Sequence, residues 1–216
     1  MPAGDRAVMG GMAVKAIVFD LDGTLYVSET FEQVIWESAS RYAGHLLGVS
    51  AIDGGDRLTA VRQRLSDERG TQQTMAVAIE AMGGTVPELH RRFAEELDPR
   101  PYIEPDPRVV SLVEALGKRY TCWLLTNNNR TLTGKILDAL GLANAFARVI
   151  TINDTWRPKP DPTVLEELLA GLGHQPAEVL FVGDRYDIDL RLPAQRGCPV
   201  LLTKTVDDLM GLAALL

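Results

Sequence analysis

The sequence has few of the residues that mark disulfide-bonded, metal-thiolate or membrane proteins. It contains two cysteines in 216 residues, Cys122 and Cys198, and they do not form a CxxC pair. This pattern predicts two buried thiols and argues against a disulfide framework or a thiolate metal site. No apolar run approaches transmembrane length, and the first dozen residues carry glycines and charges where a signal peptide has an apolar core. We therefore expect a cytoplasmic protein without a membrane partner.

Positive charge is also in short supply. The chain has 22 Lys and Arg residues against 29 Asp and Glu residues, which gives a formal net charge of -7. Because a phosphate backbone is bound by clustered basic side chains, we expect no nucleic-acid partner. Histidine is rare too: His45, His90 and His174 have no metal-ligand or catalytic spacing, and we expect them at the surface or at an interface.

What the sequence does contain is a series of short apolar segments. Since they lack strict alternation, they predict strands that are buried on both faces. Apolar residues at helical spacing separate the later segments, and Asp161 followed by Pro162 is a typical helix start. The strands are expected at 14–20, 120–126, 148–152, 179–183 and 199–203, and the helices at 106–118, 131–140, 162–172, roughly 187–196 and after Thr205. This alternation predicts an α/β fold with a doubly wound, Rossmann-like parallel sheet.

Some eighty residues lie between the first expected strand and the helix expected at 106–118, where a single crossover helix would suffice to reach the second strand. They show helical spacing at Phe31 to Leu47, Met75 to Met82 and Leu89 to Leu97, with almost no strand signal. We therefore expect a small all-helical cap domain inserted into the core. The expected division is a flexible N-terminus at 1–12, a core domain at 13–27 and 102–216, and the cap at 28–101.

Polar residues follow four of the expected strands. Asp20 and Asp22 end the first, and Lys159, between two prolines, follows the third. Ligands of an open parallel sheet bind beyond the carboxyl ends of its strands, so the fold would gather these groups at one edge. The second strand is followed by Thr126, Asn127, Asn128 and Asn129, and the fourth by Asp184, Asp187 and Asp189.

Clustered carboxylates repel one another unless a cation lies between them, and hard oxygen ligands favour magnesium. Lys159 adds a second positive charge, and Thr126 and the asparagines add hydrogen-bond donors. Such a site suits a phosphate group, and a carboxylate beyond the needs of the metal can act as nucleophile or as acid and base. Gly23 lets the backbone turn beside the ligand. The residues thus predict phosphoryl transfer.

These motifs resemble those of the haloacid dehalogenase superfamily of phosphohydrolases. The matching segments are DLDGT at 20–24, LLTNN at 124–128, RPKPDP at 157–162 and VGDRYDID at 182–189, in the family's order. Together with the expected cap they cover nearly the whole chain. The resemblance implies a magnesium-dependent phosphatase that forms an aspartyl-phosphate and hydrolyses a small phosphorylated metabolite.

The resemblance also implies a role for each matching residue. Asp20 would be the nucleophile, and Asp22 would protonate the leaving alcohol and then deprotonate water. Thr126, helped by Asn127 and the backbone at Gly23, would bind the phosphoryl oxygens, and Lys159 would neutralise their charge. Magnesium would be held by Asp20, the backbone carbonyl of Asp22, Asp184 and one further acid, for which we choose Asp189 over Asp187.

Alternatives remain at this point. The acid at position 22 argues against a dehalogenase, because displacement of halide needs no proton donor. A phosphomutase shares the core motifs, and a non-catalytic phosphate-binding module would be expected to have lost Asp20 or Lys159. The substrate and the oligomeric state are not indicated. Polar residues of the cap that could meet the leaving group are Arg41, Arg62, Arg64, Arg69 and Gln72.

Overall fold

The core of the fold is a five-stranded parallel sheet. The computed structural model describes residues 14–216, so the expected flexible segment at 1–12 lies outside the described residues. The strand order is β3-β2-β1-β4-β5, which places β1 at the centre. The strands are β1 (Ala16–Phe19), β2 (Thr121–Leu125), β3 (Arg148–Ile150), β4 (Val179–Gly183) and β5 (Val200–Leu202). The prediction of a doubly wound α/β sheet is confirmed.

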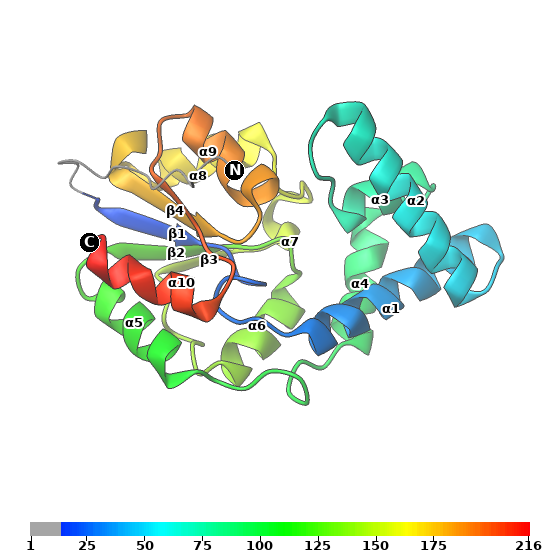
Figure 1. The fold of residues 1–216 in the computed structure, drawn as a ribbon, viewed down its shortest axis with the longest axis horizontal. Coiled ribbons are helices and arrows are strands. Elements are labelled where there is room, and N and C mark those ends of the chain that lie inside the picture. Colours follow the sequence, from blue (N-terminus) through cyan, green and yellow to red (C-terminus); the bar gives the residue numbers. More distant parts are fainter. Residues whose placement is uncertain (1–13) are drawn as a thin grey trace, which may run out of the picture.

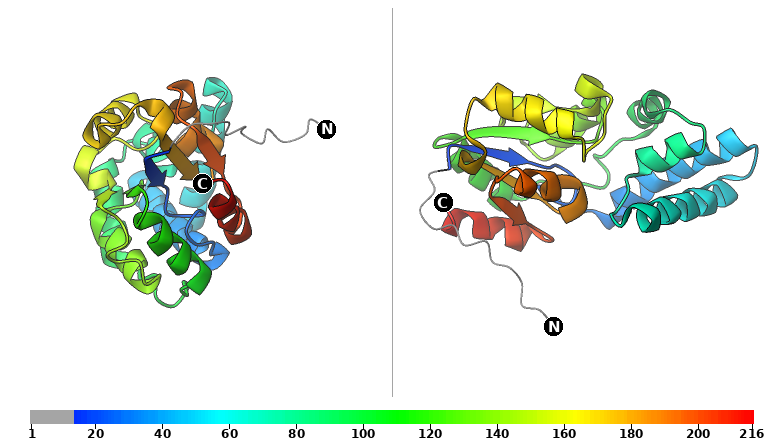
Figure 2. Two further views of the ribbon diagram at one scale, coloured as in Figure 1. Left: turned by 90° about the vertical axis from the view of Figure 1, so that its left-hand side faces the viewer. Right: turned by 90° about the horizontal axis from the view of Figure 1, so that it is seen from above.

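Helices cover both faces of this sheet, as Figures 1 and 2 show. Side chains alternate between the faces along β1, so Ile17 and Phe19 pack on one side and Ala16 and Val18 on the other. The first side meets α5 (Pro107–Gly117), α6 (Arg130–Ala139) and α10 (Val206–Met210); the second meets α8 (Pro162–Leu172), with α9 (Arg191–Gln195) nearby. Both faces of the central strands β1 and β4 are therefore buried, as their continuous apolar sequences require, whereas the edge strands β3 and β5 are partly exposed.

Local signals fix the helix starts as the sequence predicts. The Asp161 side chain accepts a hydrogen bond from the Val164 amide, with Pro162 as the first residue of α8, and Thr205 caps α10 in the same way. The expected helix at 187–196 is divided into a π-helical turn, Tyr186–Leu190, and α9. A short helix that the sequence did not indicate, α7 (Ile152–Thr155), follows β3.

Four further helices lie between β1 and α5 and are called the inserted helices here. They are α1 (Glu29–Leu47), α2 (Ala51–Arg69), α3 (Met75–Ala81) and α4 (Val86–Glu96). Figure 1 shows them beyond the carboxyl ends of the strands. The chain leaves and returns at one place: Ser28 Oγ donates a hydrogen bond to the Tyr102 carbonyl at 2.9 Å, and Phe31 stacks on the Tyr102 ring.

The helix α2 is missing from the sequence expectation, because its apolar residues are sparse and it contains two glycines. These glycines explain its place. A Cβ atom on Gly54 would lie 2.3 Å from the Gly44 backbone nitrogen of α1, and one on Gly55 would lie 2.7 Å from Ser40 Oγ. The two backbones thus approach more closely than side chains would permit, and α2 is held by close contact with α1 as much as by its buried Leu58 and Leu65.

The cysteine prediction is confirmed: Cys122 and Cys198 are free and buried. Burial raises the pKa of both thiols to about 11. Within residues 14–216, no helix combines the length and the hydropathy needed to span a bilayer.

Candidate active site

Three carboxylates converge at the carboxyl edge of the sheet. Asp20 directly follows β1, Asp184 follows β4, and Asp189 lies in the π-helical turn after it. One oxygen of each carboxylate lies within 4.8 Å of the others. Asp20 and Asp189 are buried, and Asp184 is partly exposed. The topology therefore assembles an acidic cluster from segments that lie far apart in the sequence.

Lys159 enters the same cluster from the loop before α8. Its buried ammonium nitrogen lies 2.5 Å from Asp20 Oδ1 and 2.7 Å from Asp189 Oδ1, and it donates to the Leu125 carbonyl at 2.8 Å. Asn127 positions the lysine: its side chain accepts from the Lys159 amide at 2.7 Å and donates to the Lys159 carbonyl at 3.2 Å. The Asn127 amide thus joins the end of β2 to the lysine loop.

Asp22 is not part of this cluster and has its own hydrogen-bond partners. The Tyr26 hydroxyl donates to Asp22 Oδ1 at 2.5 Å, and the Asn128 side chain donates to Oδ2 at 2.7 Å. These two bonds fix the plane of the carboxyl group. Sequence reasoning placed Asn128 after a strand but gave it no role, and it did not consider Tyr26. For Asn128, the available signal was its place in the second motif, two residues after Thr126.

Thr126 and Gly23 complete the floor of the site. Thr126 is buried, and its hydroxyl accepts from the Asn128 amide at 3.0 Å, which closes the turn after β2. Gly23 has a φ of +80°, and a Cβ atom there would lie 2.6 Å from Asp184 Oδ2. Only glycine therefore permits the loop after β1 to lie against Asp184.

Burial and neighbouring charges set the protonation of these groups. Burial, together with the charge of Asp189, raises the pKa of Asp20, and Lys159 acts in the opposite direction. Burial also raises the pKa of Asp22, although its hydrogen bond from Tyr26 opposes the shift. A raised pKa favours the protonated form of Asp22 in the resting protein, which is the form that a proton donor needs.

The donor set fits a divalent cation. Asp184 Oδ1 is buried and has no hydrogen-bond partner among the described residues, an arrangement that costs free energy unless a cation or another donor compensates it. Carboxylate oxygens are hard ligands of the kind that Mg²⁺ prefers. Asp20, Asp184 and Asp189 are the residues that could hold such an ion with their side chains.

Asp187 lies outside the acidic cluster. Its Oδ2 accepts a hydrogen bond from the Gln72 amide, in the segment between α2 and α3, at 3.1 Å, and Arg191 lies 3.7 Å from its other oxygen. Asp189 is therefore the acid that the fold brings to Asp20 and Asp184, as the sequence analysis chose, and Asp187 connects the core to the inserted helices.

A cavity of about 470 Å³ lies between the core edge and the inserted helices. Asp22, Asn127, Asn128 and Asp184 form its core side, which places the candidate proton donor at the wall of a space large enough for a small metabolite. The inserted helices contribute Glu29, Glu32, Gln33, Ile35, Trp36, Arg62, Met75, Leu89, His90 and Phe93 among others.

Comparison with known proteins decides the family. Residues 14–195 match the model of the haloacid dehalogenase-like hydrolases. The chain belongs to this family. The match includes all four motifs and the inserted helices, so the resemblance seen in the sequence is confirmed. The chain is a hydrolase of the haloacid dehalogenase type.

Named relatives of this hydrolase act on phosphorylated compounds. It is 28% identical over 203 residues to a phosphoglycolate phosphatase of Aquifex aeolicus, covering 92% of this chain and 86% of the relative. It is 29% identical over 187 residues to an N-acetylmuramic acid 6-phosphate phosphatase of Pseudomonas aeruginosa, covering 82% and 76%. The fold is similar to that of a HAD phosphatase from Thermococcus onnurineus, with a TM-score of 0.60, 21% identity and coverage of 93% and 98%.

The expectation for one histidine is wrong. His90 is buried at 5% exposure in α4 and lines the cavity, whereas the sequence analysis placed it at a surface or an interface. Its Nδ1 has no hydrogen-bond partner among the described residues. Burial lowers the pKa of His90 to about 4, so the ring is neutral at pH 7. Its position on the apolar face of α4, beside Leu89 and Phe93, was the signal for burial.

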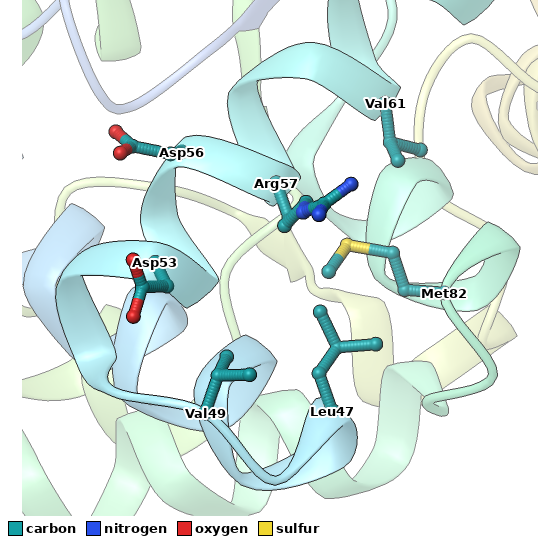
Figure 3. A pocket seen from close by; sticks show the side chains of 7 residues that line it. All are labelled: Leu47, Val49, Asp53, Asp56, Arg57, Val61 and Met82. Carbon is teal, nitrogen blue, oxygen red and sulfur yellow. The ribbon is translucent and has the colours of Figure 1, made fainter.

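A larger cavity, of about 630 Å³, lies elsewhere in the inserted helices. Figure 3 shows the tips of Leu47, Arg57 and Met82 together at its centre, with Asp53 to one side. Because none of the four motifs contributes to it, its size does not make it the catalytic site.

Proposed function

We propose that this hydrolase cleaves the phosphomonoester of a small metabolite, with Mg²⁺ as cofactor and an aspartyl-phosphate on Asp20 as intermediate. The observation that carries the proposal is the contact of buried Asp20 with Lys159 at 2.5 Å, at the acidic cluster with Asp184 and Asp189. Relatives named as phosphatases support the class of reaction. Residues 28–101 would act as a cap that closes over the substrate.

In the proposed first step, a carboxylate oxygen of Asp20 attacks phosphorus and the bond to the leaving alcohol breaks. Lys159 favours the ionised form of Asp20 against the effect of burial and counters the charge that builds on the phosphoryl oxygens. Asp22 gives its proton to the departing oxygen, so a neutral alcohol leaves. Bound Mg²⁺ would supply a positive charge that brings the anionic nucleophile and the anionic phosphate together.

In the proposed second step, Asp22 is a carboxylate and takes a proton from water. The resulting hydroxide attacks phosphorus, inorganic phosphate leaves, and Asp20 is restored. Tyr26 and Asn128 support both steps, since their hydrogen bonds to Asp22 hold it on the cavity side throughout. Contact between the phosphoryl oxygens and the Thr126 hydroxyl or the backbone at Gly23 is part of this proposal.

The test is phosphate release from a panel of phosphorylated metabolites, with Mg²⁺ and with a chelator. Asp20→Asn should lower the rate of phosphate release by several orders of magnitude, because the amide is a poor nucleophile. Chelation should also abolish release, and added Mg²⁺ should restore it. Circular dichroism of Asp20→Asn should match the parent, so that loss of folding is not the cause.

Full activity in Asp20→Asn would refute the nucleophile assignment. Transfer of phosphate to another carbon of the same sugar, with no release, would instead identify a phosphomutase. If the protein binds Mg²⁺ and a phosphorylated ligand but converts none of the panel, the proposal of a phosphatase fails in favour of a binding module.

A further inference from the structure

The cavity wall contains one arginine from the inserted helices, and its side chain has no partner among the described residues. Arg62 of α2 lines the cavity, and its side chain forms no hydrogen bond or ion pair with any of residues 14–216. Arg62 is exposed to the solvent of the cavity, so its guanidinium can form charge-assisted hydrogen bonds with a bound anion without breaking another contact. This makes Arg62 different from the other polar residues of the inserted helices.

The other candidates are already engaged or lie elsewhere. Arg41 binds Glu96 at 2.7 Å, Arg64 pairs with Glu68 at 3.6 Å, and Arg69 donates to Gln73 at 2.8 Å. Gln72 contacts the core through its backbone amide. None of these four residues lines the cavity.

The phase of α2 explains why Arg62 reaches the cavity, although its side chain is exposed to solvent. It lies four residues after Leu58 and three before Leu65, which are both buried, so the three side chains share one stripe of the helix. Arg64 lies on a different face and is 60% exposed. Arg69, four residues after Leu65, shares this stripe but does not line the cavity, so Arg62 is the arginine of the stripe that does.

A second arginine reaches the same cavity from the core. Arg185 follows Asp184 directly and lines the cavity beside it, and its Nε is buried without a hydrogen-bond partner among the described residues. Its ion pairs with Asp184 and Asp189 are long, at 3.5 and 3.8 Å. Burial, and then the charge of Arg185, lowers the pKa of Arg62, so the two guanidinium groups repel each other across the cavity.

The cavity also carries four carboxylates, from Asp22, Glu29, Glu32 and Asp184, and of these only Asp184 pairs with one of the two arginines. Glu29 and Glu32 lie in the first turn of α1, and the charge of Glu32 acts on Tyr26. Neither glutamate pairs with Arg62 or Arg185. Asp184 belongs to the proposed cation site. Arg62 and Arg185 thus come from α2 and the fourth motif, whereas the two glutamates come from the start of α1.

We propose that Arg62 and Arg185 together bind an anionic substituent on the leaving group, a carboxylate or a second phosphate. The inference rests on the proposed function, because it names the class of substrate that this site would select. The reacting phosphate lies at Asp20 and Lys159, and the second anion lies between the two arginines. An uncharged alcohol of the same size would leave Arg62 without an anionic partner and Arg185 with only its two long ion pairs, and would react more slowly.

The test compares substrates that differ in one group. The ratio of kcat/KM for 3-phosphoglycerate to kcat/KM for glycerol 3-phosphate measures the preference for a carboxylate. The ratio of kcat/KM for glycerol 1,3-bisphosphate to kcat/KM for glycerol 3-phosphate measures the preference for a second phosphate. The parent should favour one of the anionic compounds. Arg62→Gln should reduce that preference roughly 10- to 100-fold, the range expected for a hydrogen bond between charged groups. Arg62→Lys should retain part of it.

Arg64→Gln is the matched control, because it removes the same charge from the same helix outside the cavity; its preference should equal that of the parent. An unchanged preference in Arg62→Gln, or a parent that favours glycerol 3-phosphate, would overturn the inference while leaving the phosphatase proposal standing.

A binding experiment covers the case in which the parent releases no phosphate from any of the three compounds. Calorimetry on Asp20→Asn with Mg²⁺ measures the affinity for the same three compounds without turnover. The inference would be supported if an anionic compound binds more tightly than glycerol 3-phosphate and if Arg62→Gln removes this difference in affinity. That result would count even if the parent released no phosphate. Equal affinities for all three would overturn it.

Discussion

At the scale of single residues, His90 combines a neutral buried ring with a place in the cavity wall. Its ring packs edge-on against Phe93, and Asn129 donates a hydrogen bond to its backbone carbonyl at 3.0 Å. The residue therefore joins the start of α6 to α4. The imidazole must stay uncharged in the folded protein, because no carboxylate among the described residues pairs with it.

This environment predicts a loss of stability in acid. The pKa of His90 is about 4 when folded and near 6.5 when unfolded, so the unfolded chain binds the proton more readily. The contribution of neutral His90 to the free energy of unfolding is fully present above pH 6.5. It is lost as the pH falls from 6.5 toward 4, and the total loss is about 3 kcal/mol. Urea unfolding of His90→Gln between pH 4 and 7 should show a weaker pH dependence than the parent.

Exposed His45 supplies the control: His45→Gln should keep the pH dependence of the parent. Subtracting the curve of the variant removes the contributions of the active-site carboxylates, which are common to both proteins. Parallel curves for His90→Gln and the parent would show that the ring is not what acid disrupts.

At the scale of secondary-structure elements, the contact between α1 and α2 depends on glycine. Gly54→Ala should destabilise the protein by roughly 2 kcal/mol, because the new methyl group meets the backbone of Gly44 and the helices must separate. Gly134→Ala in α6 is the matched control. A Cβ there has nothing within 4 Å, so the change should stabilise the protein by roughly 0.5 to 1 kcal/mol. Urea unfolding midpoints measure both, and similar effects would refute the packing argument.

The same contact shows why the sequence predicted some elements and not others. The strands are short apolar runs, and most core helices carry a stripe of apolar residues, so local pattern suffices for them. α2 is polar and contains glycines that usually weaken a helix, and its stability comes from a neighbour that a local pattern does not contain.

A similar limit applies to the site. The four motifs pointed to Asp20, Asp22, Lys159 and Asp184, because charged groups placed directly after buried strands are costly unless they meet a charged ligand. Tyr26, His90 and the distinction between Arg62 and Arg64 depend on which way side chains point between two separate layers. Arg62 was among the candidates of the sequence analysis, but a local pattern could not select it.

At the scale of the whole molecule, the acidic cluster should link folding to metal. Bound Mg²⁺ favours the folded state, so the free energy of unfolding should rise by about 2.7 kcal/mol when free Mg²⁺ is 100 times its dissociation constant. Thermal unfolding at constant ionic strength measures this rise. Asp184→Asn should remove most of it, because the variant loses one of the three clustered carboxylates.

Asp187→Asn is the matched control, since it changes an acid of the same motif that lies outside the cluster. Its response to Mg²⁺ should equal that of the parent. A response that disappears in Asp187→Asn and persists in Asp184→Asn would reverse the assignment of the two acids.

The meeting of Ser28 and Tyr102 has a consequence for how this protein can change over generations. The inserted helices lie between these two residues, so the insertion begins and ends at one place beside the sheet. The entropy cost of closing such a loop grows only slowly with its length. An ancestor could exchange or enlarge the insertion without moving Asp20 or Lys159. The helices that line one side of the cavity could thus vary in sequence while the reacting residues of the core stay in place.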